Sequence, residues 1–369
     1  MDNKNIIFFN SASSIDLIGG SQRSIDYLIL NLHKKFKIFY ICWNFKRDKL
    51  EINKFKTHTI IKIPHPKKNI LSFIYNYPKI IKIYKSIFNT KTLLWAHSPL
   101  PFFFFKLVNK ISGKYLYSVH GPLITEINYY RKKKVNNFLI NIIYDYILKD
   151  TKKIIFNSFY TLRTSINESN FLHSKNLEVE ELLVDEVNFI HNYKKIKSNY
   201  KKKEFHNGNF YLIPRRLVKR TGVYKFIKQI IRKKINLIHR FYITGEGDQH
   251  HDIKNLCDKS KNIIFLGNID QDLLTYLISI SKGIVIPSLE AEGFCIVAKE
   301  ARLLNKFVIH TNQGGLRESL AGYKNQLIFD FANININMFS KKKLVLNKNK
   351  IIYEKNMGYF EKLNGILKI

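Results

Sequence analysis

Hydrophobic and polar positions follow two different periods along this chain. Short runs rich in Ile, Val, Phe and Tyr are separated by longer segments in which apolar residues recur at helical spacing, as at Ile25, Leu28, Ile29 and Leu32. The short runs are typical of buried strands, and the longer segments are typical of helices with one apolar face. Strands that alternate with helices predict βαβ units and parallel sheets.

The first half of the chain predicts a series of strands separated by amphipathic segments. The strands are expected at residues 6–10, 38–43, 59–63, 93–96, 115–119 and 154–157. The second half repeats this alternation, with strands expected at 210–213, 240–244, 263–266, 284–287 and 307–310, and helices at 223–232, 253–257, 273–280 and 294–304. The fold class is therefore α/β, with two Rossmann-like, doubly wound parallel-sheet domains.

The alternation lapses around residues 188–209, where Lys, Asn and Tyr dominate. Low hydrophobicity and like charges are typical of an exposed linker. We therefore expect a first domain at 1–192, a linker at 193–209 and a second domain at 210–345. Residues 346–369 carry little further signal, although 351–367 could form a final helix.

The chain is strongly basic, with 62 Lys and Arg against 28 Asp and Glu and a formal net charge of +34. Such a charge favours an acidic partner such as nucleic acid, anionic lipid or a phosphorylated substrate. Over-use of Lys, Ile and Asn is also what an AT-rich coding sequence would produce. The sequence has no recognised nucleic-acid motif, so we expect no nucleic-acid partner.

The cysteines and the hydropathy of the sequence indicate the cellular compartment of the protein. Cys42, Cys257 and Cys295 form no CxxC or His-rich ligand pattern, which predicts a reducing compartment and no structural metal. No run reaches the roughly 18 apolar residues that span a bilayer. We therefore expect a cytoplasmic protein, soluble or peripheral.

Two Lys-rich amphipathic segments leave a membrane role open. Residues 69–88 and 132–148 interleave Lys with large apolar and aromatic side chains. These segments could lie at the surface of an anionic membrane. A helix packed in an α/β core needs a similar apolar face, and amphipathicity alone does not distinguish the two cases.

The segment GIVIPSLEAEGFCIVAKEARLL, residues 283–304, is the most informative for chemistry. A strand ends near Pro287 and a helix follows Gly293, which is the kind of junction where open α/β sheets bind ligands. Phe294 and four residues at helical spacing form the apolar face, so Glu300 is expected on the polar side. If Glu292 were also helical, the two carboxylates would lie about 12 Å apart along the axis. That is too far for a glycosidase pair, so two contacts to one long ligand are favoured.

The run Glu292, Gly293, Phe294 and Glu300 resembles the E-G-F-x-x-x-x-x-E pattern of retaining bacterial glycosyltransferases with the GT-B fold, glycosyltransferase family 4, group 1 type. The resemblance implies two domains that face each other across a cleft and a final helix that crosses back to the first domain. It also implies that Glu300 holds the donor ribose and that Glu292 lies near the donor sugar and its diphosphate.

Other segments match the same family in the expected order. In the segment that resembles G-R-L-x-x-x-K-G, Arg216 matches the arginine that contacts the donor diphosphate, and Thr221 replaces the family lysine. Lys219 or Arg220 could supply that charge. Glycine turns expected against the donor are Gly245, Gly267, Gly314 and Gly315, and in the first half Gly19 and Gly20. The absence of GxGxxG removes the main support for a dehydrogenase.

Two histidines end neighbouring predicted strands in the first half. His120, in SVHGP, matches the histidine that the family places near the donor sugar, and His97, in WAHSP, ends the preceding strand. A lone histidine is more often structural, but the end of a strand in an α/β sheet is where functional groups gather.

The resemblance implies a retaining, metal-independent glycosyltransferase with Glu292, His120 and Arg216 as its catalytic residues and no cofactor besides the nucleotide-sugar substrate. The expected acceptor is a glycan or lipid-linked molecule in bacterial surface polysaccharide or lipopolysaccharide synthesis, with the enzyme at the inner face of the cytoplasmic membrane. A catalytically weak nucleotide-sugar or glycan-binding protein of the same fold is the alternative, because Thr221 departs from the family pattern.

Overall fold

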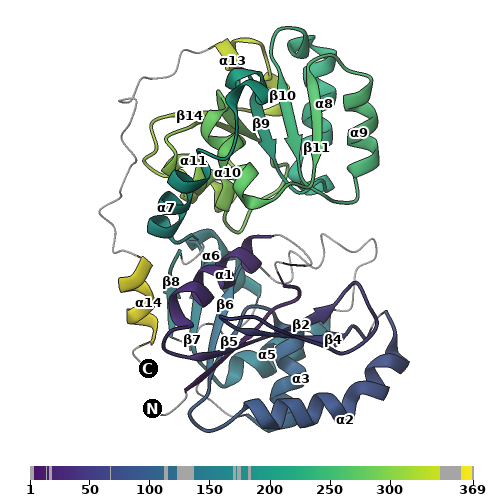
Figure 1. Ribbon diagram of the computed structural model, residues 1–369, viewed down its shortest axis with the longest axis vertical. Helices are drawn as coiled ribbons and strands as arrows, with labels where there is room; N and C mark the ends of the chain where they lie inside the picture. Colours follow the sequence, from purple (N-terminus) through teal and green to yellow (C-terminus); the bar gives the residue numbers. More distant parts are fainter. Residues whose placement is uncertain are drawn as a thin grey trace. The chain divides into compact units, whose positions relative to one another are not determined.

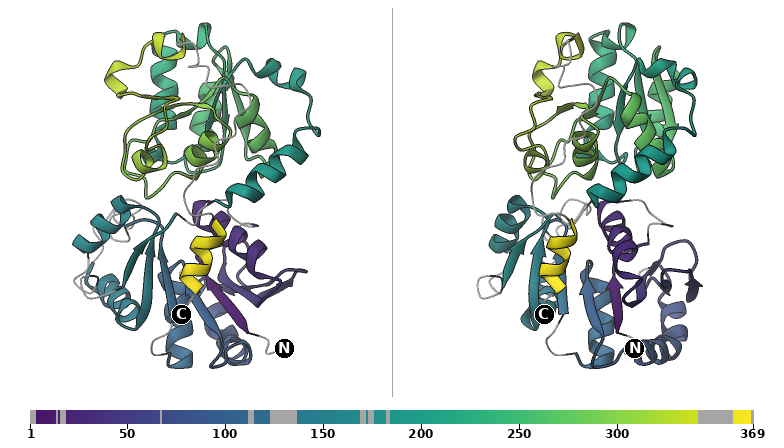
Figure 2. Two further views of the ribbon diagram at one scale, coloured as in Figure 1. Left: turned by 90° about the vertical axis from the view of Figure 1, so that its left-hand side faces the viewer. Right: turned by 60° about the vertical axis from the view of Figure 1, so that its left-hand side comes forward.

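A computed structural model describes residues 4–13, 15, 19–66, 68–111, 115–122, 137–168, 172, 176–181, 184–340 and 359–367. The chain divides into two compact units, residues 1–183 and 184–369 (Figures 1 and 2). Each unit contains one twisted sheet covered by helices, as the alternation of strands and helices predicts.

The first unit is built on a sheet with the strand order β3-β4-β2-β1-β5-β6-β7-β8. All neighbouring strands run parallel except the edge pair β3 and β4, which is antiparallel. The strands are β1 (Asn5–Phe9), β2 (Lys37–Asn44), β3 (Glu51–Lys54), β4 (Thr59–Pro64), β5 (Leu93–Ala96), β6 (Tyr115–Val119), β7 (Thr151–Phe156) and β8 (Leu177–Val179). The helices are α1 (Gly20–Leu32), α2 (Ile70–Ile87), α3 (Pro99–Asn109), α5 (Asn137–Lys149) and α6 (Phe159–Glu168).

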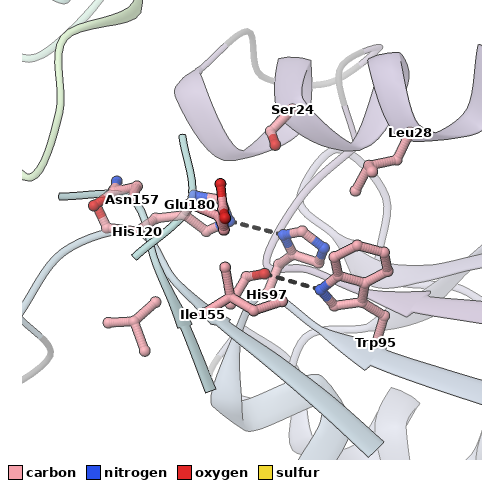
Figure 3. Close-up of a pocket in the computed structure, with 10 residues that line it drawn as sticks. Ser24, Leu28, Trp95, His97, His120, Ile155, Asn157 and Glu180 are labelled. Carbon is pink, nitrogen blue, oxygen red and sulfur yellow. Dashed lines mark hydrogen bonds between the residues drawn. The ribbon is translucent and has the colours of Figure 1, made fainter. Parts of the chain in front are cut away.

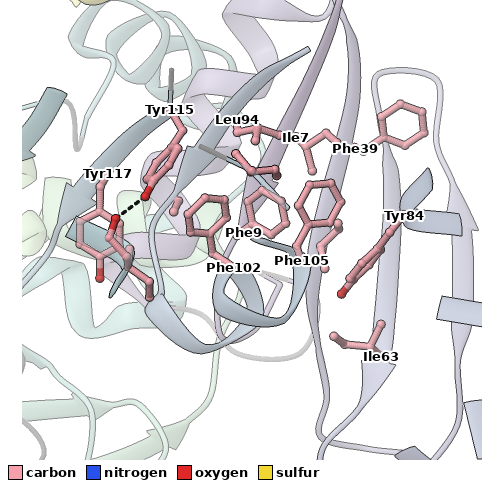
Figure 4. Packing of buried hydrophobic residues seen from close by; sticks show 14 of the residues in the cluster. Ile7, Phe9, Phe39, Ile63, Tyr84, Leu94, Phe102, Phe105, Tyr115 and Tyr117 are labelled. Atoms are coloured by element: carbon pink, nitrogen blue, oxygen red, sulfur yellow. Dashed lines mark hydrogen bonds between the residues drawn. The ribbon is translucent and has the colours of Figure 1, made fainter. Parts of the chain in front are cut away.

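Aromatic side chains fill much of the core on the α2 and α3 side of this sheet (Figure 4). The ring of Phe105 lies 4.8 Å from that of Phe9 and 4.7 Å from that of Tyr84, measured between centroids. These spacings and tilts are those preferred by aromatic pairs. The packing ties α2 and α3 to the central strand β1.

The second unit contains a fully parallel sheet with the order β11-β10-β9-β12-β13-β14. The strands are β9 (Tyr211–Pro214), β10 (Phe241–Thr244), β11 (Ile263–Gly267), β12 (Gly283–Ile286), β13 (Phe307–His310) and β14 (Gln326–Ile328). This is the Rossmann order, in which the direction of winding reverses between the first and fourth strands, here β9 and β12.

Helices cover both faces of the second sheet, so that two apolar layers form, one against each face. The helices between residues 184 and 340 are α7 (Glu186–Ile196), α8 (Val223–Arg232), α9 (His250–Asp258), α10 (Gln271–Ile280), α11 (Ile296–Leu303), α12 (Leu316–Ser319) and α13 (Asn337–Ser340), and the last helix of the chain is α14 (Tyr359–Leu367). Short 3-10 helices are η2 (Lys202–Gly208), η3 (Lys219–Thr221), η4 (Ile235–Leu237) and η5 (Phe331–Asn333). The predicted fold class is confirmed.

The strands that the sequence pattern does not reveal are β3, β8 and β14. Each lies at or near a sheet edge, and its residues are partly or fully exposed. A strand that buries little apolar surface carries no clear hydrophobic signal, because periodicity reports burial.

The region predicted as the end of the first domain and the linker is structured and belongs to the second unit. Helix α7 buries Phe189, Ile190 and Ile196, and its first residue, Glu186, forms a 3.0 Å ion pair with Lys299 of α11. The ring of Tyr200 stacks on that of Tyr276. A few apolar residues among many lysines are enough to hold this segment against α10 and α11. Residues 341–358 lie outside the described part, and the path of the C-terminal helix stays a prediction.

Within the described residues, no helix combines the length and the apolar character needed to cross a membrane. The thiols of Cys42, Cys257 and Cys295 are buried and form no disulfide bond within the described residues.

The loops at the carboxyl edge of the second sheet pack backbone against backbone. Gly222 has φ +70, and a Cβ placed on it would lie 1.9 Å from the carbonyl oxygen of Pro287, the residue after β12. Glycine is therefore required at this position for two reasons, the left-handed backbone conformation and the close approach of the Pro287 carbonyl. This contact fixes the start of α8 beside the end of β12.

We expect Gly222→Ala to destabilise the protein much more than Gly322→Ala. Both glycines have φ +70, but nothing lies within 4 Å of a Cβ on Gly322. The control should lose about 1 to 2 kcal/mol from the left-handed strain, and Gly222→Ala at least about 1 to 3 kcal/mol more from the clash. Thermal and urea unfolding midpoints measure the difference, and equal losses would contradict the packing described here.

Candidate functional site

The second unit brings charged side chains together where its strand order reverses. Arg215 follows β9 directly, and Ser288 and Glu292 lie on the loop that follows β12. In open α/β sheets, ligands bind in the crevice outside the carboxyl ends of the strands at this reversal. The segment from β9 into η3 contains Arg215, Arg216 and Arg220, and the loop from β12 to α11 contains Glu292. Both segments begin at the same edge of the sheet and bring these residues to it.

A buried ion pair forms the centre of this group. The Arg215 guanidinium donates through Nη2 to Oε1 of Glu292 and to Oγ of Ser288 at 3.3 Å, and through Nη1 to Sγ of Cys295 at 3.2 Å. Ser288 donates to the same Oε1 of Glu292 at 2.9 Å, and Nη1 of Arg220 lies 3.9 Å from Oε2. The side chains of Arg215 and Glu292 are only 10% and 7% exposed. We call Arg215, Arg220, Ser288 and Glu292 the arginine–carboxylate cluster.

The electrostatics of the arginine–carboxylate cluster favour ionised groups. Burial by itself would raise the pKa of Glu292, but Arg215, Arg220, the Ser288 hydroxyl and Arg216 together hold it below its ordinary value. Burial likewise opposes the charge on Arg215, and Glu292 overcomes that effect and raises the pKa of the guanidinium. Two guanidinium groups then face one carboxylate, which leaves an excess positive charge. Planar guanidinium groups suit the oxygens of a phosphate.

The Arg215 guanidinium has an unmet hydrogen-bonding capacity at Nε. Nε of Arg215 is buried, and no described residue accepts a hydrogen bond from it. An unmade hydrogen bond to a charged, buried donor is costly. Glu292, Ser288 and Cys295 thus leave the Nε donor of Arg215 unused.

Arg215 is the functional candidate that the sequence reading missed. It occupies the first position of the segment that resembles G-R-L-x-x-x-K-G, where the family has glycine, and the reading assigned the phosphate contact to Arg216. The Arg216 side chain is exposed and still lowers the pKa of Glu292 by its charge. Two departures from the family pattern could have revealed Arg215. An arginine stands where the family has glycine, and in the same segment Thr221 stands where the family has lysine.

The other side chains after β9 have different surroundings. Thr221 is buried, and its hydroxyl donates to the carbonyl oxygen of Arg216 at 2.6 Å or of Val218 at 2.7 Å. It therefore stabilises the turn of η3. Lys219 is exposed on the same short 3-10 helix, and Arg220 approaches Glu292.

Glu300 differs from its expected position. Its side chain is fully buried on α11 rather than on a polar, exposed face, and its Oε1 lies 3.4 Å from Nε2 of Gln271 on α10. Glu292 precedes the first helical residue, Ile296, and its N-cap, Cys295. The separation of about 12 Å that follows from one helical rise therefore does not describe this pair. Phe294, which lies between the two glutamates in the sequence, is buried, and Gly293 joins it to Glu292.

The glycines of the predicted turns after β10 and before α12 pack against the backbone of other loops. Gly315 donates its amide to the carbonyl oxygen of Glu292 at 2.7 Å, and a Cβ on Gly314 (φ +56) would lie 2.7 Å from that same oxygen. These glycines fix Glu292, so the Gly315 amide is already engaged rather than offered to an anion. Gly245 (φ +137) lies against the carbonyl of Arg215 and donates its amide to Gly267. Gly245 and Gly314 thus support the two partners of the buried ion pair.

The first unit contains a separate pocket in which His97 and His120 meet (Figure 3). Nδ1 of His97 lies 2.7 Å from Nε2 of His120, and the two rings stack at 5.0 Å between centroids. Asn157 donates to the carbonyl oxygen of His120 at 2.8 Å, and Glu180 lines the same pocket. Gly19 and Gly20 form the N-cap and first residue of α1, the helix that brings Ser24 to this pocket.

Both imidazoles of this pair are neutral near pH 7. Burial lowers the pKa of His120 to about 4, and burial together with the neighbouring His120 ring lowers the pKa of His97 well below its ordinary value. Nε2 of His97 and Nδ1 of His120 are buried without a hydrogen-bond partner among the described residues. Each ring therefore retains one nitrogen that can bind a hydroxyl group.

The histidine pair should make the stability of the protein depend on pH. His120 binds a proton more readily when unfolded, near pKa 6.5, than when folded, near 4. Its contribution is therefore fully present above pH 6.5 and decreases as the pH falls towards 4, by at most about 1.4 kcal/mol per pH unit. Urea unfolding across this range should show a smaller decrease for His120→Gln than for wild type. His251→Gln, at an exposed histidine, is the control and should keep the wild-type slope.

Comparison with known proteins supports the sequence resemblance. Residues 194–362 match the sequence family described as Glycosyl transferases group 1. Among curated proteins, no sequence matches this chain significantly.

Solved structures similar to this chain share its architecture at low sequence identity. A sucrose-phosphate synthase from Thermosynechococcus elongatus has a TM-score of 0.69 at 14% identity, with 92% of this chain and 88% of that chain covered. A UDP-forming α,α-trehalose-phosphate synthase from Burkholderia xenovorans gives 0.65 at 12%, with 90% and 88% covered. A trehalose-6-phosphate structure from E. coli bound with UDP-2-fluoro glucose gives 0.59 at 12%, with 89% and 88% covered.

These similarities extend over nearly the whole chain and concern the fold, whereas the family match is confined to the unit that contains the arginine–carboxylate cluster. The chain therefore has the GT-B fold, and its residues 194–362 carry the sequence pattern of the group 1 glycosyltransferases.

Proposed function

We propose that this protein is a retaining, metal-independent glycosyltransferase. It transfers a sugar, of the hexosyl type, from a nucleotide-sugar donor to a glycan or lipid-linked acceptor in bacterial surface polysaccharide synthesis. The observation that supports this most directly is the arginine–carboxylate cluster, which lies at the strand reversal inside the segment that matches the family. A lipid-linked acceptor would place the enzyme at the inner face of the cytoplasmic membrane.

The difficult event in this reaction is the departure of the nucleoside diphosphate. The bond between the anomeric carbon and the diphosphate oxygen breaks, the same carbon bonds to the acceptor oxygen, and the acceptor proton passes to the leaving diphosphate. Negative charge grows on that leaving group, so fixed positive groups stabilise the transition state. In this proposal Arg215, Arg216 and Arg220 supply that charge, with Lys219 nearby, and Arg215 compensates for the lysine that Thr221 replaces.

The remaining assignments follow the same proposal. Glu300 accepts hydrogen bonds from the donor ribose, which suits a carboxylate held in place beside Gln271. His120 contacts the sugar that is transferred, through an imidazole that stays neutral because its pKa is low. A neutral imidazole can accept a hydrogen bond from a sugar hydroxyl, whereas an imidazolium cannot.

A screen of labelled nucleotide sugars tests the proposal. Wild-type protein should release nucleotide from one donor in the presence of a glycan or lipid-linked acceptor. Glu300→Ala and Arg216→Ala should each lower that rate on the order of a hundredfold, because each removes a charged contact to the donor. Arg232→Ala changes an exposed arginine on α8 and should keep the wild-type rate.

Two outcomes of this screen would count against the proposed enzyme. Wild-type rates in both site variants would exclude these residues from donor chemistry. Donor affinity without any nucleotide release would favour the alternative, a nucleotide-sugar or glycan-binding protein of the same fold.

We further expect Glu292→Gln to separate binding from transfer. In the free protein the Glu292 carboxylate occupies the guanidinium of Arg215, so a diphosphate must compete with it. Removing that negative charge should tighten the binding of the free nucleoside diphosphate, by about tenfold or 1.4 kcal/mol, while transfer slows. Titration calorimetry with UDP, GDP and inorganic pyrophosphate measures the affinity, and circular dichroism checks the fold.

Glu290→Gln is the matched control for this prediction. Glu290 is an exposed carboxylate two positions away on the same loop. The Glu290→Gln change removes the same charge without affecting the contact to Arg215. The affinity of this variant for the diphosphate should therefore remain close to that of wild type. Equal affinities in wild type and in a folded Glu292→Gln variant would show that the carboxylate does not compete with the ligand.

A further inference from the structure

Helix α2 presents apolar side chains on two of its faces. On the inner face, Phe73, Ile80 and Tyr84 are buried against the sheet and α3. This face accounts for the amphipathic pattern in the sequence and leaves the other apolar residues of the helix unexplained.

The outer side of the first turns of α2 is also apolar. Leu71 and Tyr75, four positions apart, are each 76% exposed, and Ile70 and Ile74, also four positions apart, are more than half exposed. Residues at this spacing form one continuous strip along a helix. Apolar and aromatic groups gathered in this way on a surface mark an interaction site more often than scattered ones do.

Positive charge continues the strip towards the C-terminal end of the helix. Lys79, Lys82 and Lys85 are exposed, and the ammonium group of Lys79 lies 5.7 Å from the centroid of the Tyr75 ring. The helix contains no Asp or Glu between Ile70 and Ile87. We call Ile70, Leu71, Ile74, Tyr75, Lys79, Lys82 and Lys85 the α2 face.

We propose that the α2 face docks the protein on an anionic lipid bilayer. The aliphatic side chains enter the boundary between headgroups and acyl chains, where interfacial helices bury their apolar face. Tyr rings favour the headgroup level. Lys side chains extend their methylene stems along the apolar surface and keep their ammonium groups among the lipid phosphates. The absence of carboxylates on the helix removes the repulsion that would weaken this contact.

Charge complementarity favours the bilayer over a second copy of this chain. Two α2 faces in contact would bring their lysines together without any acidic partner on the helix. On an anionic surface each lysine instead adds about fivefold to binding, the equivalent of about 1 kcal/mol. The docking proposal concerns neither the arginine–carboxylate cluster nor the histidine pocket, so it can fail while the proposed transfer stands.

Co-sedimentation of the full chain with vesicles tests the docking. We expect binding to vesicles of phosphatidylcholine mixed with phosphatidylglycerol, and weak binding to phosphatidylcholine alone. Leu71→Ser combined with Tyr75→Ser should lower the partition coefficient on the order of tenfold. Lys79→Gln, Lys82→Gln and Lys85→Gln combined should lower it on the order of a hundredfold, as three basic groups predict.

The matched control changes two exposed apolar residues of the second unit. Leu237→Ser combined with Ile238→Ser removes a similar apolar surface away from α2 and should bind like wild type. Thermal unfolding confirms that each variant is folded. The proposal is overturned by equal vesicle binding in all folded variants, or by wild-type binding that does not depend on anionic lipid. Sedimentation that shows self-association abolished by the Leu71 and Tyr75 changes, without vesicle binding, would assign the face to a second copy instead.

Discussion

The buried ion pair between Arg215 and Glu292 connects the ends of the two strands at which the second sheet reverses its winding. Breaking such a pair would leave one charge buried and uncompensated, which costs several kcal/mol. The surrounding structure is arranged to keep it intact. Gly245 makes room for the backbone of Arg215, and Gly314 with Gly315 holds the backbone of Glu292. The glycines on both sides of this contact therefore hold the backbone of its two partners.

The same contact gives the proposed donor site its particular character. The Glu292 carboxylate pairs with the buried Arg215 guanidinium and holds it in place in the absence of ligand. In the proposed binding mode, a diphosphate competes with Glu292 for Arg215, so one anion replaces another at a guanidinium that is already in position. The pocket of the first unit differs in its electrostatics, because burial keeps the His97 and His120 pair neutral.

The sequence predicted the alternation of strands and helices well because parallel strands buried on both faces are continuous apolar runs. β5, β6, β13 and α8 have the predicted bounds. It failed for β3, β8 and β14, which bury little, and for α7, whose few apolar residues are diluted by lysine. In the site, the pattern from Glu292 to Glu300 indicated the right loop and helix, but it placed Glu300 on an exposed face and overlooked Arg215.

The sequence by itself determined the fold class, the order of the strands along the chain and the segment that matches the glycosyltransferase family. These follow from local periodicity and short motifs, which are properties of neighbouring residues. Only the tertiary structure decided which arginine meets Glu292, that His97 and His120 share a pocket, and that α2 keeps a second apolar face in solvent. Each of these depends on contacts between residues far apart in the chain, which no local pattern encodes.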